Sequence, residues 1–435
     1  MKAKGALRGL GAVGGTNDGL LKRTGAGNNE GAAMKLVRDV NVSAHKTVRS
    51  AADLAVNGAP PMFAEPIHVG RPNIGNHKRF LERASNILDS GWLSNNGPFA
   101  QEFEQRIASF LDVKHCVAMC NGTIALEIAT RALDLKGEVI VPSYTFIATA
   151  HALQWQEITP IFADIDPATH NLDPAAVWRM ITPRTTGIVG VHLWGRGSPV
   201  KELEAIAREH NLRLMFDASH GFGCSLGGKL LGGFGECEVF SFHATKFFNT
   251  FEGGAVVTNN DALAEKMRLM RNFGFSGYDN VIYPGTNGKL TEISAAMGLT
   301  NLEDLEEFVT INRRNYHCYR DAISAVHGLS VLEYDEAERN NYQYVVMEVA
   351  PYFPVSRDRI VDVLHAENVL ARRYFWPGCH NMEPYRSYYP HAGLMLPNTK
   401  CVAERVIVLP TGVAMHTDAI GGITSVLAVL AAGTA

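Results

Sequence analysis

Residues 115–146, HCVAMCNGTIALEIATRALDLKGEVIVPSYTF, carry the pattern that decides the fold. The run HCVAM at 115–119 is short and mostly apolar, and EVIVPSYTF at 138–146 is rich in β-branched and aromatic residues, so both are predicted strands. Between them, TIALEIATRAL at 123–133 has the amphipathic spacing of a helix. Two strands joined by a helix predict a parallel pair with a right-handed crossover.

The same alternation continues to about residue 259. Such a chain is typical of a mainly parallel sheet with helices on both faces, so we predict the α/β fold class. Ligands of these sheets bind at the carboxyl ends of the strands. Helices are predicted at 148–155, 174–181 and 200–210, and strands at 159–165, 185–194, 212–218, 237–242 and 254–259.

The C-terminal part of the chain has a different pattern, which predicts a smaller α+β domain. It begins with a long helical stretch at 292–323 and ends with a helix, and between them lie predicted strands at 342–349 and 403–410 and a helix at 357–368. We therefore predict a large domain at 61–310 and a small domain at 311–435.

Residues 1–60 are rich in Gly, Ala and Asn, and we predict a flexible extension there. The extension contains GLGAVG at 9–14, which matches the dinucleotide fingerprint G-x-G-x-x-G. That fingerprint requires a strand before its first glycine, and MKAKGALR is not one. A linker is therefore the better interpretation, and a dinucleotide-dependent oxidoreductase is the weaker hypothesis.

Composition excludes several classes of partner. The chain has 435 residues and a net charge of -4, so it lacks the basic field that nucleic-acid binding requires. Its seven cysteines are scattered without metal-ligand spacing, and we expect reduced thiols in the cytoplasm and no bound metal. The apolar run ITSVLAVLAA at 423–432 is too short to cross a membrane, and we expect neither a membrane anchor nor a signal peptide.

Four strand ends carry side chains or backbone groups with useful chemistry. Asn121 to Thr123 open a helix directly after a strand, where free N–H groups favour an anion such as phosphate. Phe146 offers a flat ring, Asp217 a carboxylate and Lys246 an amine. An amine, an acid, a ring and an anion cradle at one edge of a sheet are what pyridoxal phosphate requires.

The expected roles follow from the chemistry of that cofactor. Lys246, in FSFHATKFFNTF, would form a Schiff base with the aldehyde, and apolar surroundings would lower its pKa. Asp217 would keep the pyridine nitrogen protonated, and such a charge pair contributes on the order of 4 kcal/mol at 4 Å. Each residue alone has an ordinary structural explanation, such as a helix cap for Asp217 or a core position for Phe146. The combination in this order favours the site.

At this point the sequence resembles the DegT/DnrJ/EryC1/StrS family of nucleotide-sugar aminotransferases, which are fold-type I pyridoxal-phosphate enzymes. The resemblance extends from about Gly91 to the C-terminus. Its motifs are NNGPFAQEFE, NGTIALEIA, VIVPSYTFIATAHAL, VHLWG, DASHGFG, SFHATK, FEGGAVV, GTNGKLTEISAAMGL and VIVLPTG.

The resemblance implies a cofactor site and a homodimer. It implies that Lys246 and Ser241 of SFHATK bind the cofactor and its phosphate, and that Asn287 of GTNGK completes the phosphate site of the neighbouring subunit. The remaining implied cofactor contacts are Gly122, Thr123, Phe146, Asp217 and His220.

Two positions depart from the family pattern. His220 stands where many relatives have glutamine, so the hydrogen bond to the ring hydroxyl depends on its tautomer. Lys289 stands where relatives commonly have arginine, and bidentate binding is lost. A dehydratase branch of the family has histidine in place of the Schiff-base lysine, so Lys246 favours an aminotransferase.

The resemblance also implies an activity. L-glutamate would donate an amino group to the C4 ketone of a dTDP-4-keto-6-deoxyhexose, and C3-keto or GDP-linked 4-keto-6-deoxymannose substrates remain alternatives. A non-catalytic regulator with this fold is a further alternative, which predicts loss of Lys246 or Asp217. Candidate substrate contacts are Arg372, Arg373, His380, Tyr385 and Lys289.

Overall fold

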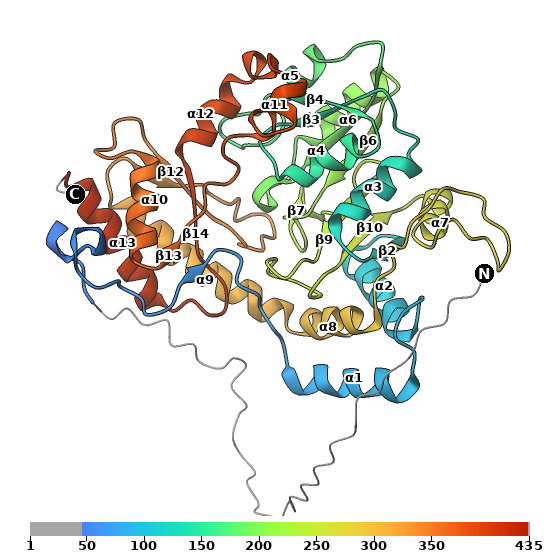
Figure 1. The fold of residues 1–435 in the computed structure, drawn as a ribbon, viewed down its shortest axis with the longest axis horizontal. Helices are drawn as coiled ribbons and strands as arrows, with labels where there is room; N and C mark the ends of the chain where they lie inside the picture. Colours follow the sequence, from blue (N-terminus) through green and yellow to red (C-terminus); the bar gives the residue numbers. More distant parts are fainter. Residues whose placement is uncertain (1–45, 434–435) are drawn as a thin grey trace, which may run out of the picture. The chain divides into compact units, whose positions relative to one another are not determined.

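The computed structural model describes residues 46–433, and its central element is a seven-stranded sheet (Figure 1). Only β10 runs antiparallel to its neighbours, and the other strands are mutually parallel. The strand order is β2 (His115–Met119), β10 (Gly254–Thr258), β9 (Cys237–Ser241), β6 (Arg213–Asp217), β5 (Thr185–Val191), β3 (Glu138–Pro142) and β4 (Thr159–Ala163). The predicted α/β fold class is confirmed.

Helices cover both faces of the sheet, because alternate strand residues point to opposite sides. Apolar side chains of one face pack under α3 (Gly122–Ala132), α4 (Ile147–Gln154) and α7 (Asp261–Met270). The other face packs under two pairs of helices, which are α2 (Pro98–Leu111) with α8 (Glu292–Glu303) and α5 (Pro174–Arg179) with α6 (Val200–Glu209).

Several predicted elements have different bounds in the structure, and two of these differences change how the chain is arranged. The predicted strand at 138–146 ends at Pro142, and Phe146 is instead the N-cap residue of α4. The predicted helix at 292–323 is divided at Asp304 into α8 and α9 (Leu305–Ser324). Asp304 ends α8 and begins α9 with ψ near 12°, which turns the chain between the two helices.

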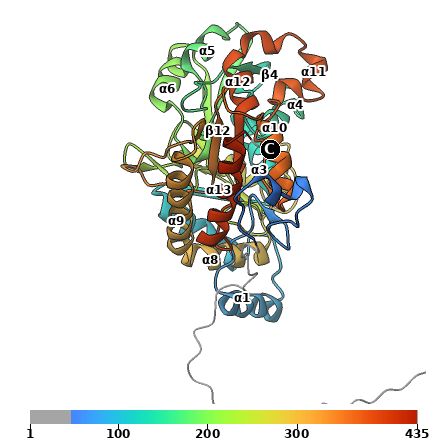
Figure 2. The ribbon, with the colours of Figure 1, turned by 90° about the vertical axis from the view of Figure 1, so that its left-hand side faces the viewer.

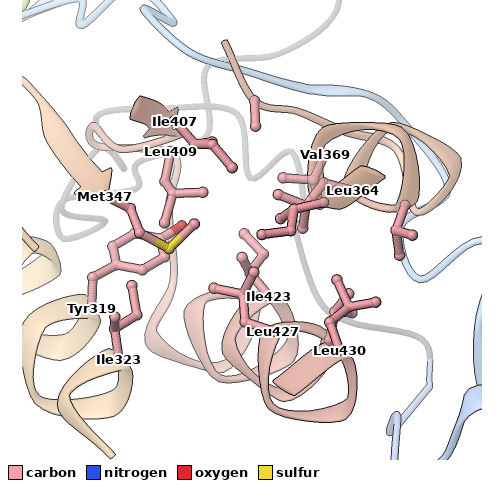
Figure 3. Packing of buried hydrophobic residues seen from close by; sticks show 14 of the residues in the cluster. Tyr319, Ile323, Met347, Leu364, Val369, Ile407, Leu409, Ile423, Leu427 and Leu430 are labelled. Carbon is pink, nitrogen blue, oxygen red and sulfur yellow. The ribbon is translucent and has the colours of Figure 1, made fainter. Parts of the chain in front are cut away.

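The small domain is built around an antiparallel sheet of β11 (Leu329–Val331), β12 (Val345–Val349) and β14 (Val406–Leu409). Its helices are α9, α10 (Arg357–Ala366) and α13 (Thr417–Ala431), and α9 and α13 lie side by side in Figure 2. Figure 3 shows the apolar core between them, where Ile423 and Leu427 of α13 lie near Leu364 of α10. This core holds the small domain together.

Residues 46–68 pack against the small domain, which differs from the predicted flexible extension at 1–60. Val48 and Leu54 join its core, and β1 (Ile67–His68) pairs in parallel with β13 (Val369–Leu370). The buried carboxylate of Glu367 accepts hydrogen bonds from the backbone N–H groups of Ala55 and Met62, each at 2.7 Å. Residues 46–60 are therefore not part of a flexible extension, and β1 pairs with a strand of the small domain although the predicted large domain begins at residue 61.

The remaining elements are short, apart from α1. They are η1 (Ala51–Asp53), η2 (Ala55–Asn57), α1 (His77–Ser90), η3 (Leu193–Gly195), β7 (Ser225–Leu226), β8 (Lys229–Leu230), η4 (Cys379–Asn381), α11 (Tyr385–Tyr388), η5 (Ala392–Met395) and α12 (Pro397–Arg405). The GLGAVG motif at 9–14 lies outside the described residues. Within 46–433, no helix has both the length and the apolar character needed to cross a membrane.

Candidate active site

A cavity of about 570 Å³ lies at the carboxyl ends of the parallel strands. Asp217 is the last residue of β6, Ser241 is the last residue of β9, and Lys246 lies on the loop that follows β9. Gly122 and Thr123 begin α3 directly after β2. Because parallel strands end at the same edge of the sheet, residues far apart in sequence line one cavity.

The amine of Lys246 is the reactive group of this cavity. Burial lowers the pKa of Lys246 to about 8, and the nearby carboxylate of Asp217 opposes that shift. Phe242, Phe247 and Phe248 are buried in the apolar cluster that also contains residues of α2 and α8. The lysine is therefore set apart from its aromatic sequence neighbours and lines the cavity.

The carboxylate of Asp217 is fixed by two donors. The hydroxyl of Thr149 donates to Oδ2 at 2.8 Å, and the backbone N–H of Ser219 donates to Oδ1 at 3.1 Å. The side chain is buried, so a cation placed beside it interacts in a medium of lower dielectric constant than water. Such a carboxylate suits a protonated pyridine nitrogen.

The start of α3 provides the anion cradle. Asn121 caps the helix through a hydrogen bond from Ile124 N–H to its Oδ1, at 2.8 Å. The N–H groups of Gly122 and Thr123 have no acceptor among residues 46–433. A Cβ at Gly122 would lie 2.9 Å from the Cβ of Ser241, so only glycine lets the strand end approach the helix. Free N–H groups, a helix dipole and the Ser241 hydroxyl suit a phosphate.

Two rings complete the cavity wall. Phe146 is 56% exposed and lines the cavity, which leaves its ring available for stacking. His220 is buried, and this burial, with the nearby Lys246, holds its pKa well below the usual value. The backbone N–H of Trp194 donates to Nδ1 of the neutral His220 ring at 3.3 Å, which places the proton on Nε2. The sequence left the tautomer of His220 open, and in the structure His220 can donate a hydrogen bond through Nε2.

These groups fit pyridoxal phosphate. The cavity brings together an amine of lowered pKa, a fixed carboxylate, a ring face, and backbone N–H donors at a helix N-terminus. Each matches a distinct part of the cofactor: the aldehyde, the pyridine nitrogen, the ring and the phosphate.

The two predicted residues of the GTNGK motif, Asn287 and Lys289, lie outside this cavity. Asn287 is exposed, and its backbone bridges to Asn272. Lys289 donates to Oδ1 of Asn272 at 3.2 Å, and its ammonium lies 4.7 Å from the ring centre of Phe273. Neither residue lines the cavity of its own chain.

The four substrate candidates near the C-terminus divide into two pairs. Arg372 and Arg373 are exposed and line a second cavity that adjoins the first. His380 is 3% exposed and shares a 2.6 Å hydrogen bond with the hydroxyl of Ser143. Tyr385 is fully buried. Burial of His380 and Tyr385 contradicts their predicted contact with substrate, and both are core residues.

Three residues of the site were missed in the sequence. Tyr344 lies in the small domain, and its hydroxyl is 3.5 Å from Nζ of Lys246. Thr149 fixes Asp217, and Trp194 sets the tautomer of His220. No local signal marks Tyr344, because YQYVVMEV has the composition of any buried strand. The spacing of residues in the predicted helix at 148–155 likewise does not distinguish Thr149 from its neighbours.

The lowered pKa of Lys246 predicts how the apoenzyme reacts with pyridoxal phosphate. The neutral amine is the nucleophile, and it predominates above pH 8 rather than above about 10.4, the value for a free lysine. The rate of covalent attachment should therefore rise through pH 8 and level off by about pH 9. Stopped-flow absorbance would measure it, with Nα-acetyl-lysine as the control for ionisation of the cofactor itself. A rate for the protein that still climbs steeply between pH 9 and 10 would contradict the assignment.

Comparison with known proteins places the chain among sugar aminotransferases. The family model described as the DegT/DnrJ/EryC1/StrS aminotransferase family matches residues 75–428. The dTDP-4-amino-4,6-dideoxy-D-glucose transaminase of Shigella dysenteriae is 35% identical over 363 residues, which cover 83% of this chain and 98% of that protein. The GDP-perosamine synthase of Caulobacter vibrioides is 35% identical over 325 residues, 73% of this chain and 86% of that protein.

A solved structure extends this similarity to three dimensions. The crystal structure of DesI in the presence of its TDP-sugar product superposes with a TM-score of 0.84 and 48% sequence identity. The alignment covers 88% of this chain and 97% of DesI.

Proposed function

Because this chain belongs to the DegT/DnrJ/EryC1/StrS aminotransferase family, and is thus a pyridoxal-phosphate-dependent nucleotide-sugar aminotransferase, we propose its substrate and regiochemistry. The amino group passes from L-glutamate to the C4 ketone of a dTDP-linked 4-keto-6-deoxyhexose. The name of the Shigella dysenteriae relative specifies an amino group on C4 of a dTDP-linked sugar, and DesI was solved with a TDP-sugar. The placement of Lys246 and Asp217 in one cavity is the observation that carries the chemistry.

The residues of the cavity have separate roles in this reaction. Pyridoxal phosphate supplies an electron sink for the reacting carbon. Lys246 would hold the cofactor, and its Nζ would take a proton from the donor carbon and return one in the second half-reaction. Asp217 keeps the pyridine nitrogen protonated, while Thr149 and Ser219 keep the carboxylate in place.

The remaining cofactor contacts bind and orient. Gly122, Thr123 and Ser241 would donate hydrogen bonds to the phosphate, Phe146 would stack on the ring, and His220 would donate through Nε2 to the ring hydroxyl. Tyr344, which lies 3.5 Å from Nζ of Lys246, orients the amine between the two half-reactions.

The proposal includes a homodimer in which each subunit completes the other's site. Asn287 is exposed and outside its own cavity, and it lies on a segment with large apolar side chains on the surface. A monomer rarely exposes such a group, and a second copy would cover it. The exposed residues are Phe273, Phe275, Tyr278, Val281 and Ile282. Asn287 would then reach the partner's phosphate site, with Lys289 beside the partner's substrate.

The proposed function is tested with the cofactor-loaded enzyme and a panel of keto sugars. L-glutamate alone should shift the visible absorption of the bound cofactor, and one nucleotide-linked keto sugar should restore it. Initial rates with both substrates should follow ping-pong kinetics. NMR of the product would identify the aminated carbon. Amination at C3, or a preference for the GDP-linked sugar, would replace the proposed substrate, and an absorption indifferent to every amino donor would refute the activity.

A further inference from the structure

His170 is a buried side chain that joins the large domain to the small one. It lies on the loop after β4 and is 1% exposed. Its Nε2 is 2.8 Å from Oε1 of Glu348, which belongs to β12 of the small domain. Its Nδ1 accepts a hydrogen bond from the indole Nε1–H of Trp194 at 3.1 Å. Neither His170 nor Glu348 lines the Lys246 cavity, so any influence on the reaction must pass through other residues.

The two partners of His170 determine which of its nitrogens carries the proton. An indole N–H can only donate, so Nδ1 of His170 is the unprotonated nitrogen. The proton of the neutral ring is then on Nε2, which donates it to the carboxylate of Glu348. Burial opposes ionisation of Glu348, but the His170 hydrogen bond and the nearby Arg405 together hold its pKa below the usual value. A hydrogen bond to an ionised carboxylate is stronger than one between neutral groups.

The backbone of His170 and Trp194 is held in an unusual conformation. Their φ angles are 62° and 61°, in the left-handed region that residues other than glycine rarely adopt. The N–H of His170 donates to the carbonyl of Asp166 at 2.8 Å, and the N–H of Asp166 donates to the carbonyl of Asn171 at 2.9 Å. Such conformations persist only where the surrounding contacts compensate for them, and they are concentrated at functional sites.

Trp194 and Glu348 each lead to the active site. The indole of Trp194 lies nearly parallel to the His220 ring, with ring centres 5.8 Å apart, and it meets the Tyr344 ring edge-on at 5.2 Å. Tyr344 directly precedes β12 and lies four residues before Glu348, so the alternation of side chains along a strand places both on one face. The hydroxyl of Tyr344 is 3.5 Å from Nζ of Lys246.

We propose that His170 is a positioning residue, whose two hydrogen bonds hold the small domain against the large one so that Tyr344 covers the amine of Lys246. Burial favours the neutral, nucleophilic form of this amine, and Tyr344 supplies part of the cover from the small domain. Loss of the bond to Glu348 would hold β12 less firmly and let water approach the amine. The inference goes beyond the proposed function, because it concerns attachment of the cofactor and not the identity of the sugar.

The test measures the pH midpoint for covalent attachment of pyridoxal phosphate to the full-length apoenzyme by stopped-flow absorbance. H170N keeps an acceptor for the indole N–H of Trp194, because its Oδ1 lies at the position of the histidine Nδ1, but it has no donor that reaches Glu348. The groups that surround Lys246 are all unchanged. The midpoint of about 8 should therefore rise by about one pH unit, toward the value of a free lysine.

H317N is the matched control for this variant. His317 also lies 2.8 Å from a carboxylate oxygen, that of Glu336, but both residues belong to the small domain and line neither cavity. Its attachment midpoint should stay at about 8, as for loss of an exposed charge pair. A rise of the same size in H170N and H317N would indicate a general loss of packing and would overturn the proposal.

E348Q and the double variant provide the second measurement. Glutamine keeps an acceptor for His170 but not the charge, so the midpoint should rise less than in H170N. Both substitutions weaken one bond, so H170N/E348Q should shift the midpoint no further than H170N alone. Additive shifts would refute a shared route. E348Q decides the outcome if H170N does not fold, since it keeps the size of the side chain.

A lowered Tm is the result that a merely structural pair would give. Variants of His170 and Glu348 that melt at a lower temperature but keep the wild-type attachment midpoint would assign the pair to stability alone and overturn the proposal. A different preferred sugar would leave all these midpoints as they are, so failure of the proposed substrate is distinguishable from failure of this inference.

Discussion

Lys246→Ala is expected to lower kcat by about 10⁴-fold or more, since it removes both the covalent attachment of the cofactor and the proton carrier. The side chain lines the cavity without supporting the core, so the variant should fold normally. Turnover of L-glutamate with the keto sugar, measured by product chromatography, gives the loss. Borohydride reduction of the wild-type holoenzyme followed by peptide mapping should label position 246.

Lys229→Ala is the matched control for that variant. Lys229 also lies beside an aromatic ring, with its ammonium 5.1 Å from the centre of the Phe234 ring, but it lines neither cavity. Its activity should stay within about twofold of the wild type, as for other surface substitutions. A Lys246→Ala enzyme that retained a tenth of wild-type turnover would refute the role of this amine.

Asp217→Asn is expected to slow the half-reaction with L-glutamate by about 10³-fold. The variant keeps the size and polarity of the side chain but removes the negative charge, and such a charge pair contributes on the order of 4 kcal/mol at 4 Å. Lys246 is unchanged, so the cofactor should still attach and still absorb in the visible range. Single-turnover absorbance after mixing with L-glutamate measures the rate, and it separates slow chemistry from loss of the cofactor.

Asp166→Asn controls for the loss of a carboxylate near a strand end. Asp166 follows β4 and accepts N–H hydrogen bonds from Ala168 and Thr169, much as Asp217 accepts one from Ser219. It lines neither cavity, so its half-reaction should match the wild type. Equal rates for wild type and Asp217→Asn would show that no charge is needed at the pyridine nitrogen, and the assigned chemistry would fail.

Local sequence patterns predicted most of the large domain. The bounds of β2 match the predicted strand at 115–119, and α3 differs from the predicted helix by one residue at each end. Hydrophobic periodicity depends on neighbours within a few positions, so it can be recognised in the sequence without knowledge of the fold. The same patterns placed Asp217 and Lys246 at or just after strand ends, and parallel strands bring such ends to one edge.

Patterns failed where a contact between distant segments decided the outcome. The segment CHNMEPY at 379–385 contains polar and aromatic residues that suit either a binding surface or a core. His380 shares a hydrogen bond with Ser143, and Tyr385 shares one with His151. These bonds offset part of the cost of burying the two polar side chains. Residues 46–60 resembled a linker in composition, yet two apolar side chains and the buried carboxylate of Glu367 hold them on the small domain.

The sequence by itself determined the α/β class, the order of most strands and helices, and the amine, acid, ring and anion cradle of the site. Only the tertiary structure decided that Tyr344 faces Lys246 from a position 98 residues away, that His220 donates through Nε2, and that Arg372 and Arg373 line a second cavity. The physical reason is the distance along the chain between the residues that interact. Periodicity and strand ends are set by adjacent residues, whereas hydrogen-bond partners, burial and ion pairing depend on which distant segments pack together.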